Sequence, residues 1–271
     1  MRLRDTCGIA VPGVRDERTT VGAMPGPTAS ERRHSVRTGL VWDAVRGALD
    51  EVRPDAGERG AEGQARILDI GGGTGGFAVP LAQLGHRVLV IDPSPDALAA
   101  PDRRAHESGV ADLVSAQQGD LSDLSGLAGT ADLVLCHGVL DVVSDPVAAL
   151  AALSGALSEG GVLSLVVGQL HAAVIARAMA GHFQGARELL DSPEAGRGRR
   201  FTHDEIRGLL AAAGLDTFAV HAVRVFADLV PGSLLDLEAG ASAALADLER
   251  AVATRPEYFP LAAQLHLLAR H

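Results

Sequence analysis

A short apolar stretch that runs directly into a cluster of glycines constrains the fold of this chain more than any other feature. Residues 65–70 have the composition of a buried strand, the run 71–76 reads Gly-Gly-Gly-Thr-Gly-Gly, and residues 77–84 have helical spacing. Glycine lets a backbone approach a ligand closely and adopts positive φ at little cost. The pattern therefore predicts a strand, a turn that binds a nucleotide cofactor, and a helix.

Strands and helices alternate along the rest of the chain. Apolar runs predict six further strands, and helical spacing separates most of them. Such alternation with right-handed crossovers is typical of an α/β fold with a doubly wound, mostly parallel sheet, here of seven strands. The further strands are expected at residues 86–91, 113–117, 131–136, 162–167, 217–226 and 261–270, and the later helices at residues 95 onward, 145–157, 170–190, 206–213 and 234–253.

The ends of the pattern suggest the domain organisation. Residues 1–35 mix charge, proline and glycine and are expected to form a flexible tail. Residues 36–52 have helical spacing and are expected to form a helical cap over the site. We expect one domain over residues 36–271, in which residues 170–200 form an insertion that covers the open, substrate side of the cofactor site.

Charge and cysteine content exclude several classes of protein. The formal net charge is −10, which argues against binding nucleic acid by overall charge, although arginine supplies all 24 basic side chains. Cys7 and Cys136 are far apart, so neither a disulfide framework nor a cysteine zinc site is expected, and the reducing cytoplasm is the expected location. We see no run long enough for a signal peptide or membrane span, and no metal-ligand spacing.

The glycines alone leave the cofactor open. Gly71, Gly73 and Gly76 satisfy the dinucleotide GxGxxG spacing, which suits a nicotinamide or flavin enzyme as well as other nucleotide-binding proteins. Asp92, at the end of the second strand, suits a nicotinamide enzyme too.

Acidic residues lie at or near the ends of three successive strands. Asp69 lies two residues before the first glycine, Asp92 ends the second strand, and the pair Gly119-Asp120 ends the third. Each aspartate alone is a common helix cap or turn former. Three of them at the ligand-binding edge of one parallel sheet instead predict a site for a ligand with several hydrogen-bond donors.

This set of residues resembles the class I S-adenosylmethionine-dependent methyltransferases. The resemblance implies S-adenosyl-L-methionine as the cofactor, with Asp69 near its methionine end, Asp92 on the two ribose hydroxyls and Asp120 near the adenine amino group. A carboxylate suits a vicinal diol because it accepts two hydrogen bonds at once. The same resemblance places further residues at the cofactor, namely Gly71, Gly73, Pro93, Gly119, Leu121 and His137.

A closer resemblance covers nearly the whole chain after residue 36. The segments that carry it look like the tRNA 5-carboxymethoxyuridine methyltransferase family, which esterifies a carboxylate on a wobble uridine. The resemblance implies that Arg37 pairs with the cofactor carboxylate, and it places His171 and Arg224 on the substrate side. The matching segments are residues 37–42, 136–146, 161–165, 179–183 and 223–226.

Several substrate-side positions depart from that family. Gly168-Gln169 replaces an aromatic-asparagine pair, Leu229 stands where the family has tyrosine, and an arginine is missing from residues 261–264. The basic stretch is reduced to residues 197–200, where Arg199 is the expected substrate contact. Tyr258, the single tyrosine, is a further candidate for contact with the substrate. The resemblance therefore transfers better to the cofactor half than to the substrate half.

Four functions follow from these observations. The favoured one is O-methylation of a carboxylate on a modified tRNA wobble uridine, with tRNA as partner and a role in tRNA processing. A carboxylate is already ionised and needs no base, so Arg199 or Arg224 would orient it; a hydroxyl acceptor would instead need His137 or His171 as catalytic base. The alternatives are a small-molecule O-methyltransferase, a nicotinamide-dependent oxidoreductase, and a non-catalytic cofactor-binding regulator.

Overall fold

The computed structural model describes residues 29–52, 63–194, 198–237 and 240–271, without the side chains of residues 29–38, 232, 236 and 237. The expected tail therefore lies largely outside the described residues. All seven expected strands are present in one sheet with the order β3-β2-β1-β4-β5-β7-β6. The strands are β1 (Arg66–Ile70), β2 (Arg87–Asp92), β3 (Val114–Gln118), β4 (Ala131–His137), β5 (Leu157–Gly168), β6 (Asp216–Val223) and β7 (Gln264–Arg270).

The sheet is doubly wound, as the alternating pattern predicts. β1 pairs in parallel with β2 and β4, β2 with β3, and β4 with β5, whereas β7 runs antiparallel to both β5 and β6. Because β7 is reversed, its first residue lies at the same edge of the sheet as the last residues of the other strands. The carboxyl edge therefore collects the ends of all six remaining strands and the start of β7.

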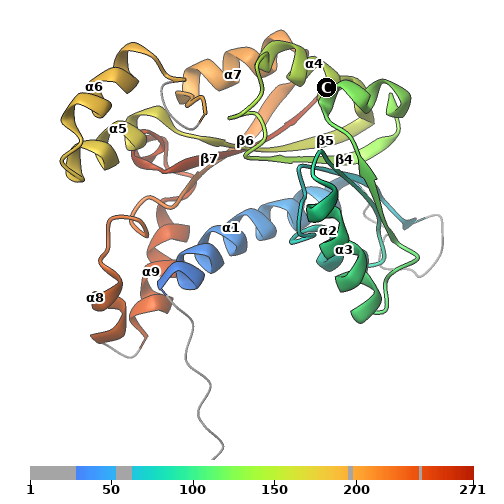
Figure 1. The fold of residues 1–271 in the computed structure, drawn as a ribbon, viewed down its shortest axis with the longest axis horizontal. Helices are drawn as coiled ribbons and strands as arrows, with labels where there is room; N and C mark the ends of the chain where they lie inside the picture. The colour runs from blue at the N-terminus through green and yellow to red at the C-terminus, as the bar shows by residue number, and fades with distance from the viewer. Residues whose placement is uncertain (1–28, 53–62, 195–197, 238–239) are drawn as a thin grey trace, which may run out of the picture.

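Helices cover both faces of the sheet (Figure 1). On one face lie α1 (Ala29–Val52), α2 (Ala78–Gln83) and α3 (Pro95–Glu107), and on the other α4 (Pro146–Ala156) and α7 (His203–Ala212). The remaining helical segments are η2 (Leu121–Leu127), α5 (Leu170–Met179), α6 (Phe183–Asp191), α8 (Gly232–Leu237), α9 (Ala241–Val252) and η3 (Pro256–Leu261).

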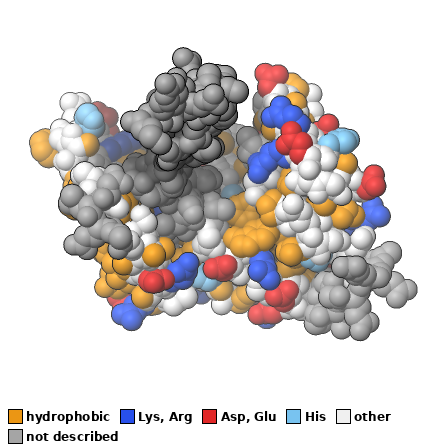
Figure 2. All heavy atoms as spheres, turned by 90° about the horizontal axis from the view of Figure 1, so that it is seen from below, with side chains coloured by type: hydrophobic (Ala, Val, Ile, Leu, Met, Phe, Trp, Pro, Cys, Tyr) orange, Lys and Arg blue, Asp and Glu red, His pale blue; other side chains and the backbone are white. Residues whose placement is uncertain are grey.

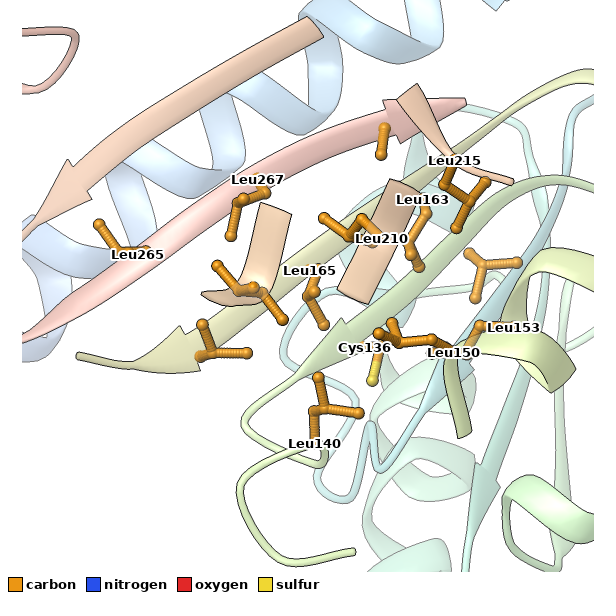
Figure 3. Packing of buried hydrophobic residues seen from close by; sticks show 14 of the residues in the cluster. Cys136, Leu140, Leu150, Leu153, Leu163, Leu165, Leu210, Leu215, Leu265 and Leu267 are labelled. Atoms are coloured by element: carbon orange, nitrogen blue, oxygen red, sulfur yellow. The ribbon is translucent and has the colours of Figure 1, made fainter. Parts of the chain in front are cut away.

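Two apolar clusters separate these layers. Leu163 and Leu165 of β5 point into the cluster shared with α4 and α7, which Figure 3 shows from close by. Val162 and Val166 of the same strand point into the second cluster, toward α1 and α2. Since β5 is buried on both faces, it reads as a continuous apolar run rather than as an alternating one.

Side-chain caps fix where the helices begin at the carboxyl edge. Ser94 Oγ accepts a hydrogen bond from Ala97 N at 3.3 Å at the start of α3, and Asp145 accepts from two backbone amides at the start of α4. Thr202 caps α7 in the same way. Each cap satisfies amides that would otherwise lack partners, so the turns next to the site are well defined.

Several boundaries differ from the sequence predictions. α1 begins at Ala29 instead of residue 36, because no glycine or proline interrupts residues 29–35. The helical pattern at 170–190 forms two helices that break at Gly181, where φ is 78°, and the pattern at 234–253 breaks at Gly240, where φ is 91°. The last strand begins at Gln264, since the prolines of η3 hold the preceding residues in a 3-10 turn.

Candidate functional site

A cavity of about 820 Å³ opens at the carboxyl edge of the sheet, between the ends of β1, β2, β3 and β4 and the segments η2 and α4. This is the position at which open α/β sheets bind their ligands. The cavity brings together most of the cofactor residues expected from the sequence. Those in its wall are Gly71, Asp92, Pro93, Gly119, Asp120, Leu121 and His137.

The turn after β1 leaves no room for side chains at several of its glycines, including Gly71 and Gly72. A Cβ on Gly71, whose φ is 67°, would collide with the side chain of Val139, and a Cβ on Gly72 would collide with the carboxylate of Asp69. The Gly71 amide donates to Ile91 O at 2.7 Å, which ties the turn to β2. The glycines are therefore required by close packing around the cavity mouth as well as by positive φ.

Asp69 lies beneath this turn and is buried. Burial, and then the nearby charge of Asp92, raise the pKa of the Asp69 carboxyl to about 7. A buried carboxylate with no compensating cation is unfavourable, so the proton is retained to a much higher pH than in a free side chain. The arrangement favours a cation arriving at this point.

Asp92 joins the end of β2 to the glycine turn. Its Oδ2 accepts from Gly73 N at 3.1 Å and its Oδ1 from Ser94 N at 2.9 Å. Each carboxylate oxygen has a second lone pair, so Asp92 can accept further hydrogen bonds from a ligand in the cavity.

Asp120 lies across the cavity at the start of η2. Its carboxylate accepts from the amide and the hydroxyl of Ser122, and these bonds hold the pKa of Asp120 below its usual value. The side chain of Asp123 in turn accepts from Asp120 N at 2.9 Å, which completes a capping box. Asp120 is therefore both a structural cap and an exposed acceptor in the cavity wall.

His137 ends β4 and lies in the same wall. Its ring meets the ring of Phe77 edge-on, with 4.9 Å between centroids, and Phe77 contacts Trp42 of α1 at 6.0 Å. The described part of α1 thus reaches the pocket through an aromatic contact. Arg37 lies on α1, but its side chain is outside the described residues.

None of the four residues expected on the substrate side lies in the wall of this cavity. His171 is exposed at the start of α5, where its Nδ1 lies 3.1 Å from the amide nitrogen of Gln169. Tyr258 packs against Phe226, with 6.1 Å between ring centroids. All four follow β5 or β6 or precede β7, so they occupy the other half of the carboxyl edge.

The two substrate-side arginines are engaged in ion pairs. Arg199 contacts Glu205 at 2.6 Å, and Arg224, whose φ of 60° is unusual for a residue with a side chain, contacts Asp228 at 2.7 Å. The Nε atoms of both arginines are buried and have no hydrogen-bond partner among the described residues. Each guanidinium therefore keeps one donor for which the described protein supplies no acceptor.

Asp141 lies next to the candidate site, and the sequence analysis did not single it out. Its carboxylate accepts from Gly168 N at 3.0 Å, and Arg200 lies 3.8 Å away. These contacts tie the loop after β4 to the end of β5, between the two halves of the edge. The only signal in the sequence was an acidic residue within the segment 136–146. Its contact with Gly168, 27 residues further along, could not be read from the sequence.

No group of histidine, cysteine, aspartate and glutamate side chains in the described parts of the chain is arranged to hold a metal ion. Among the described helices, none is long and apolar enough to cross a membrane.

Comparison with known proteins identifies the class. Residues 68–163 match a family described as a methyltransferase domain. Magnesium protoporphyrin IX methyltransferase from Synechocystis PCC 6803 with bound SAH has a similar fold, with a TM-score of 0.60 and 16% identity over 92% of this chain and 90% of that one. Geranyl diphosphate methyltransferase in complex with SAM gives a TM-score of 0.58 at 19% identity, covering 91% and 92% of the two chains. The chain is a class I S-adenosylmethionine-dependent methyltransferase, which sets aside the nicotinamide alternative.

Two relatives of known activity bear on the acceptor. The chain is 29% identical to the tRNA 5-carboxymethoxyuridine methyltransferase of Escherichia coli (strain K12), over 87% of this chain and 88% of that protein. It is 37% identical to the ubiquinone biosynthesis O-methyltransferase of Methylocella silvestris, but over 56% of this chain and 59% of that protein. The first similarity spans both halves of the carboxyl edge, whereas the second covers about half the chain.

Proposed function

We propose that this methyltransferase esterifies a carboxylate on a modified wobble uridine of tRNA. The observation that carries the proposal is the extent of the similarity to the Escherichia coli tRNA enzyme, 242 residues that cover 88% of that protein. A match confined to the cofactor-binding core would carry no information about the acceptor. This match includes the substrate-side segments after β5 and β6 as well.

In our proposal the cofactor binds in the cavity at the ends of β1 to β4, a position supported by its place at the carboxyl edge of the sheet. In our proposal Asp92 accepts from the ribose hydroxyls, Asp120 and Leu121 line the adenine end, and Asp69 and Arg37 lie toward the amino acid end. Gly71, Gly73, Pro93 and Gly119 form the backbone wall between them, and His137 closes the side next to β4. S-adenosylmethionine supplies a methyl group bound to a sulfonium.

The protein contributes mainly position to the reaction. Holding an acceptor oxygen in line with a bound electrophile can supply about 7 to 11 kcal/mol of barrier lowering, so no covalent protein intermediate is needed. A carboxylate acceptor is already ionised. In the proposal, the guanidinium N–H groups of Arg224 and Arg199 orient this carboxylate, with His171 and Tyr258 beside them. Residues 36–271 then act as one domain, in which residues 170–200 form the substrate side.

The second function, O-methylation of a small molecule, has its own support. The ubiquinone O-methyltransferase relatives share more identity per residue over the part that matches, and the net charge of −10 is unusual for a protein that binds RNA. On the face shown in Figure 2, basic and acidic side chains lie among one another around a hydrophobic area. A phenolic or alcoholic acceptor must lose a proton, for which His137 or His171 would serve as base.

One labelling experiment separates the two functions. The protein is incubated with tritiated S-adenosylmethionine and total tRNA from a strain that lacks its own wobble-uridine carboxyl methyltransferase. We expect alkali-labile label in the tRNA, because an ester is cleaved by mild base and an ether is not. Turnover on phenols or small acids without any labelled tRNA would overturn the tRNA proposal and establish the small-molecule function.

The cofactor assignment is tested separately by calorimetry. Asp92→Ala should weaken binding of S-adenosylhomocysteine by roughly 10-fold or more, since charge-assisted hydrogen bonds contribute about 1.5 to 3 kcal/mol. Asp96→Ala, four residues along at the exposed start of α3, is the matched control and should leave affinity unchanged. Unchanged affinity in Asp92→Ala would show that the cofactor binds elsewhere.

We also propose a cytoplasmic location, which is supported by the free, buried Cys136.

A further inference from the structure

Three histidines and a serine form a continuous hydrogen-bonded row inside the protein, which we call the histidine row. His137 Nε2 lies 2.9 Å from Ser164 Oγ, which lies 2.9 Å from His266 Nε2. His266 Nδ1 lies 3.1 Å from His221 Nδ1, and the planes of these two rings are 18° apart, with 5.2 Å between centroids. One end of the row, His137, is in the wall of the cofactor cavity.

The row crosses four adjacent strands. His137 is on β4, Ser164 on β5, His266 on β7 and His221 on β6, the edge strand. The strand registers align His137 and His266 with Val166 of β5, and His221 with His266. Val166 belongs to the apolar cluster toward α1, so the row runs through an otherwise apolar layer.

Burial makes the hydrogen bonds of the row obligatory. Ser164 and His266 are fully buried, and a buried polar group without a partner costs about 1 to 3 kcal/mol. Burial, with the neighbouring His221 and His137, also holds the pKa of His266 well below its ordinary value, and burial lowers the pKa of His221. Near neutral pH these two rings are uncharged, and each carries a single ring proton.

Single protons give the row a direction. A neutral imidazole donates through one nitrogen and accepts through the other, and a hydroxyl donates once. Every bond in the row needs one donor, so choosing the donor of one bond fixes all the others. An imidazole in contact with water carries its proton more often on Nε2 than on Nδ1, and His221 is half-buried on the edge strand. His221 Nδ1 then accepts from His266 Nδ1, His266 Nε2 accepts from the Ser164 hydroxyl, and Ser164 accepts from His137 Nε2.

We propose that Ser164, His266 and His221 are positioning residues that hold His137 in its Nε2–H tautomer and in one ring orientation, with Nδ1 as the acceptor nitrogen. The inference deepens the proposed function, since it concerns a residue of the proposed cofactor pocket. Holding a wall residue in one tautomer presents the ligand with a single pattern of donors and acceptors, which gives specificity that an isolated histidine lacks.

The tautomer is measured directly by nitrogen NMR of the ¹⁵N-histidine-labelled full-length protein, with the His137 signals identified by their loss in His137→Asn. Wild-type protein should show a protonated Nε2 and an unprotonated Nδ1 at His137. Ser164→Ala, which breaks the row next to His137, should give an averaged signal of both tautomers. His221→Phe should do the same from the far edge of the sheet, a remote effect that a purely structural role of His221 does not produce.

Two variants control for packing. Ser154→Ala deletes another buried serine hydroxyl, which donates to Ala213 O at 2.9 Å outside the row, and should leave the His137 signals unchanged. Ser164→Thr keeps the hydroxyl and should restore the wild-type signals. Affinity for S-adenosylhomocysteine should fall about three- to tenfold in Ser164→Ala, the equivalent of one hydrogen bond, and recover in Ser164→Thr.

The outcomes distinguish this inference from the function on which it rests. An Nδ1–H or mixed tautomer of His137 in the wild-type protein overturns the inference. The inference is also overturned if the His137 signals in both His221→Phe and Ser164→Ala are the same as in the wild-type protein. If the expected tautomers are found but wild-type protein does not bind S-adenosylhomocysteine, the positioning role stands and the assignment of the cofactor pocket is wrong.

Discussion

At the scale of single residues, Asp69 connects protonation to cofactor binding. Its pKa of about 7, set by burial and by Asp92, means that a substantial fraction of the carboxyl groups is protonated at neutral pH before any ligand arrives. In the proposed pocket Asp69 lies toward the ammonium group of the cofactor. An adjacent positive charge stabilises the carboxylate and lowers its pKa, so binding should expel the proton.

The expected result is release of about half a proton per site when S-adenosylhomocysteine binds at pH 7, given a carboxyl pKa near that pH. Calorimetry in two buffers with different enthalpies of ionisation measures this number, and apparent affinity should rise between pH 6 and pH 8. Asp69→Asn cannot release this proton and should show equal binding enthalpies in the two buffers. Equal enthalpies already in the wild-type protein would contradict the coupling.

Sequence patterns predicted some site residues and missed others for a physical reason. Asp92 and Asp120 could be placed at the cavity because they lie at the ends of β2 and β3, and the ends of parallel strands meet at one edge. Ser164 and His266 stand alone within apolar strands, and their importance depends on the pairing of β5 with β7, which brings together residues about a hundred positions apart. Glu205 and Asp228 lie only six and four residues from their arginines, but sequence spacing alone does not show that these side chains pair.

At the scale of elements, α9 fixes the segment that carries Arg224. Glu249 of α9 is buried, and its carboxylate accepts from three consecutive backbone amides after β6, those of Val225, Phe226 and Ala227, at 2.7 to 2.9 Å. Arg224 immediately precedes this segment and has a positive φ. The carboxylate thus compensates for a strained backbone at the proposed acceptor side.

Glu249→Ala should lower the free energy of unfolding by roughly 3 kcal/mol or more, since it leaves buried amides without an acceptor. Glu249→Gln retains one acceptor oxygen and should cost about half as much. Asp247→Ala removes an exposed pair with Arg250 on the same helix and should cost about 0 to 1 kcal/mol. Urea unfolding measures all three, and similar losses for Glu249→Ala and Asp247→Ala would refute the anchoring role.

The sequence predicted the positions of the strands better than the breaks within the long helical segments. The first four strands match their expected ranges to within about one residue, because apolar runs between turn residues define them. Gly181 and Gly240 lie inside long helical patterns, and a glycine there is compatible with a continuous helix as well as with a break. Packing of α5 against α6, and of α8 against α9, selects the break in the folded protein.

At the scale of the whole molecule, the carboxyl edge of the sheet has two halves with different sequence signals. The cavity between β1 and β4 lies within the segment that matches the methyltransferase domain, and the ends of β5 and β6 and the start of β7 carry the proposed acceptor residues. The histidine row and the Asp141 contacts with Gly168 join the two halves. In the proposed arrangement, a cofactor bound in one half therefore lies next to the elements that we propose orient the acceptor in the other.

The buried titratable groups predict how stability depends on pH. Burial lowers the pKa of His86, His221 and His266 below the ordinary value of 6.5, so below that pH the unfolded chain binds protons that the native protein excludes. Their contribution to stability is fully present above pH 6.5 and is lost as the pH falls. Asp69 acts oppositely between its unfolded pKa of 3.8 and about 7, where the native protein binds the extra proton.

With three histidines opposing one aspartate, the free energy of unfolding should decrease as the pH falls from 6.5 to about 5, by about 1.4 kcal/mol per pH unit for each net proton. His221→Gln removes one of these histidines and should flatten the decrease. Saturating S-adenosylhomocysteine should make the decrease in unfolding free energy steeper. A cation next to Asp69 keeps its carboxylate ionised, so the native protein no longer gains stability by protonating Asp69. Urea unfolding at a series of pH values measures all three slopes, and stability that is constant or rises toward pH 5 would show that the histidines take up protons in the folded state.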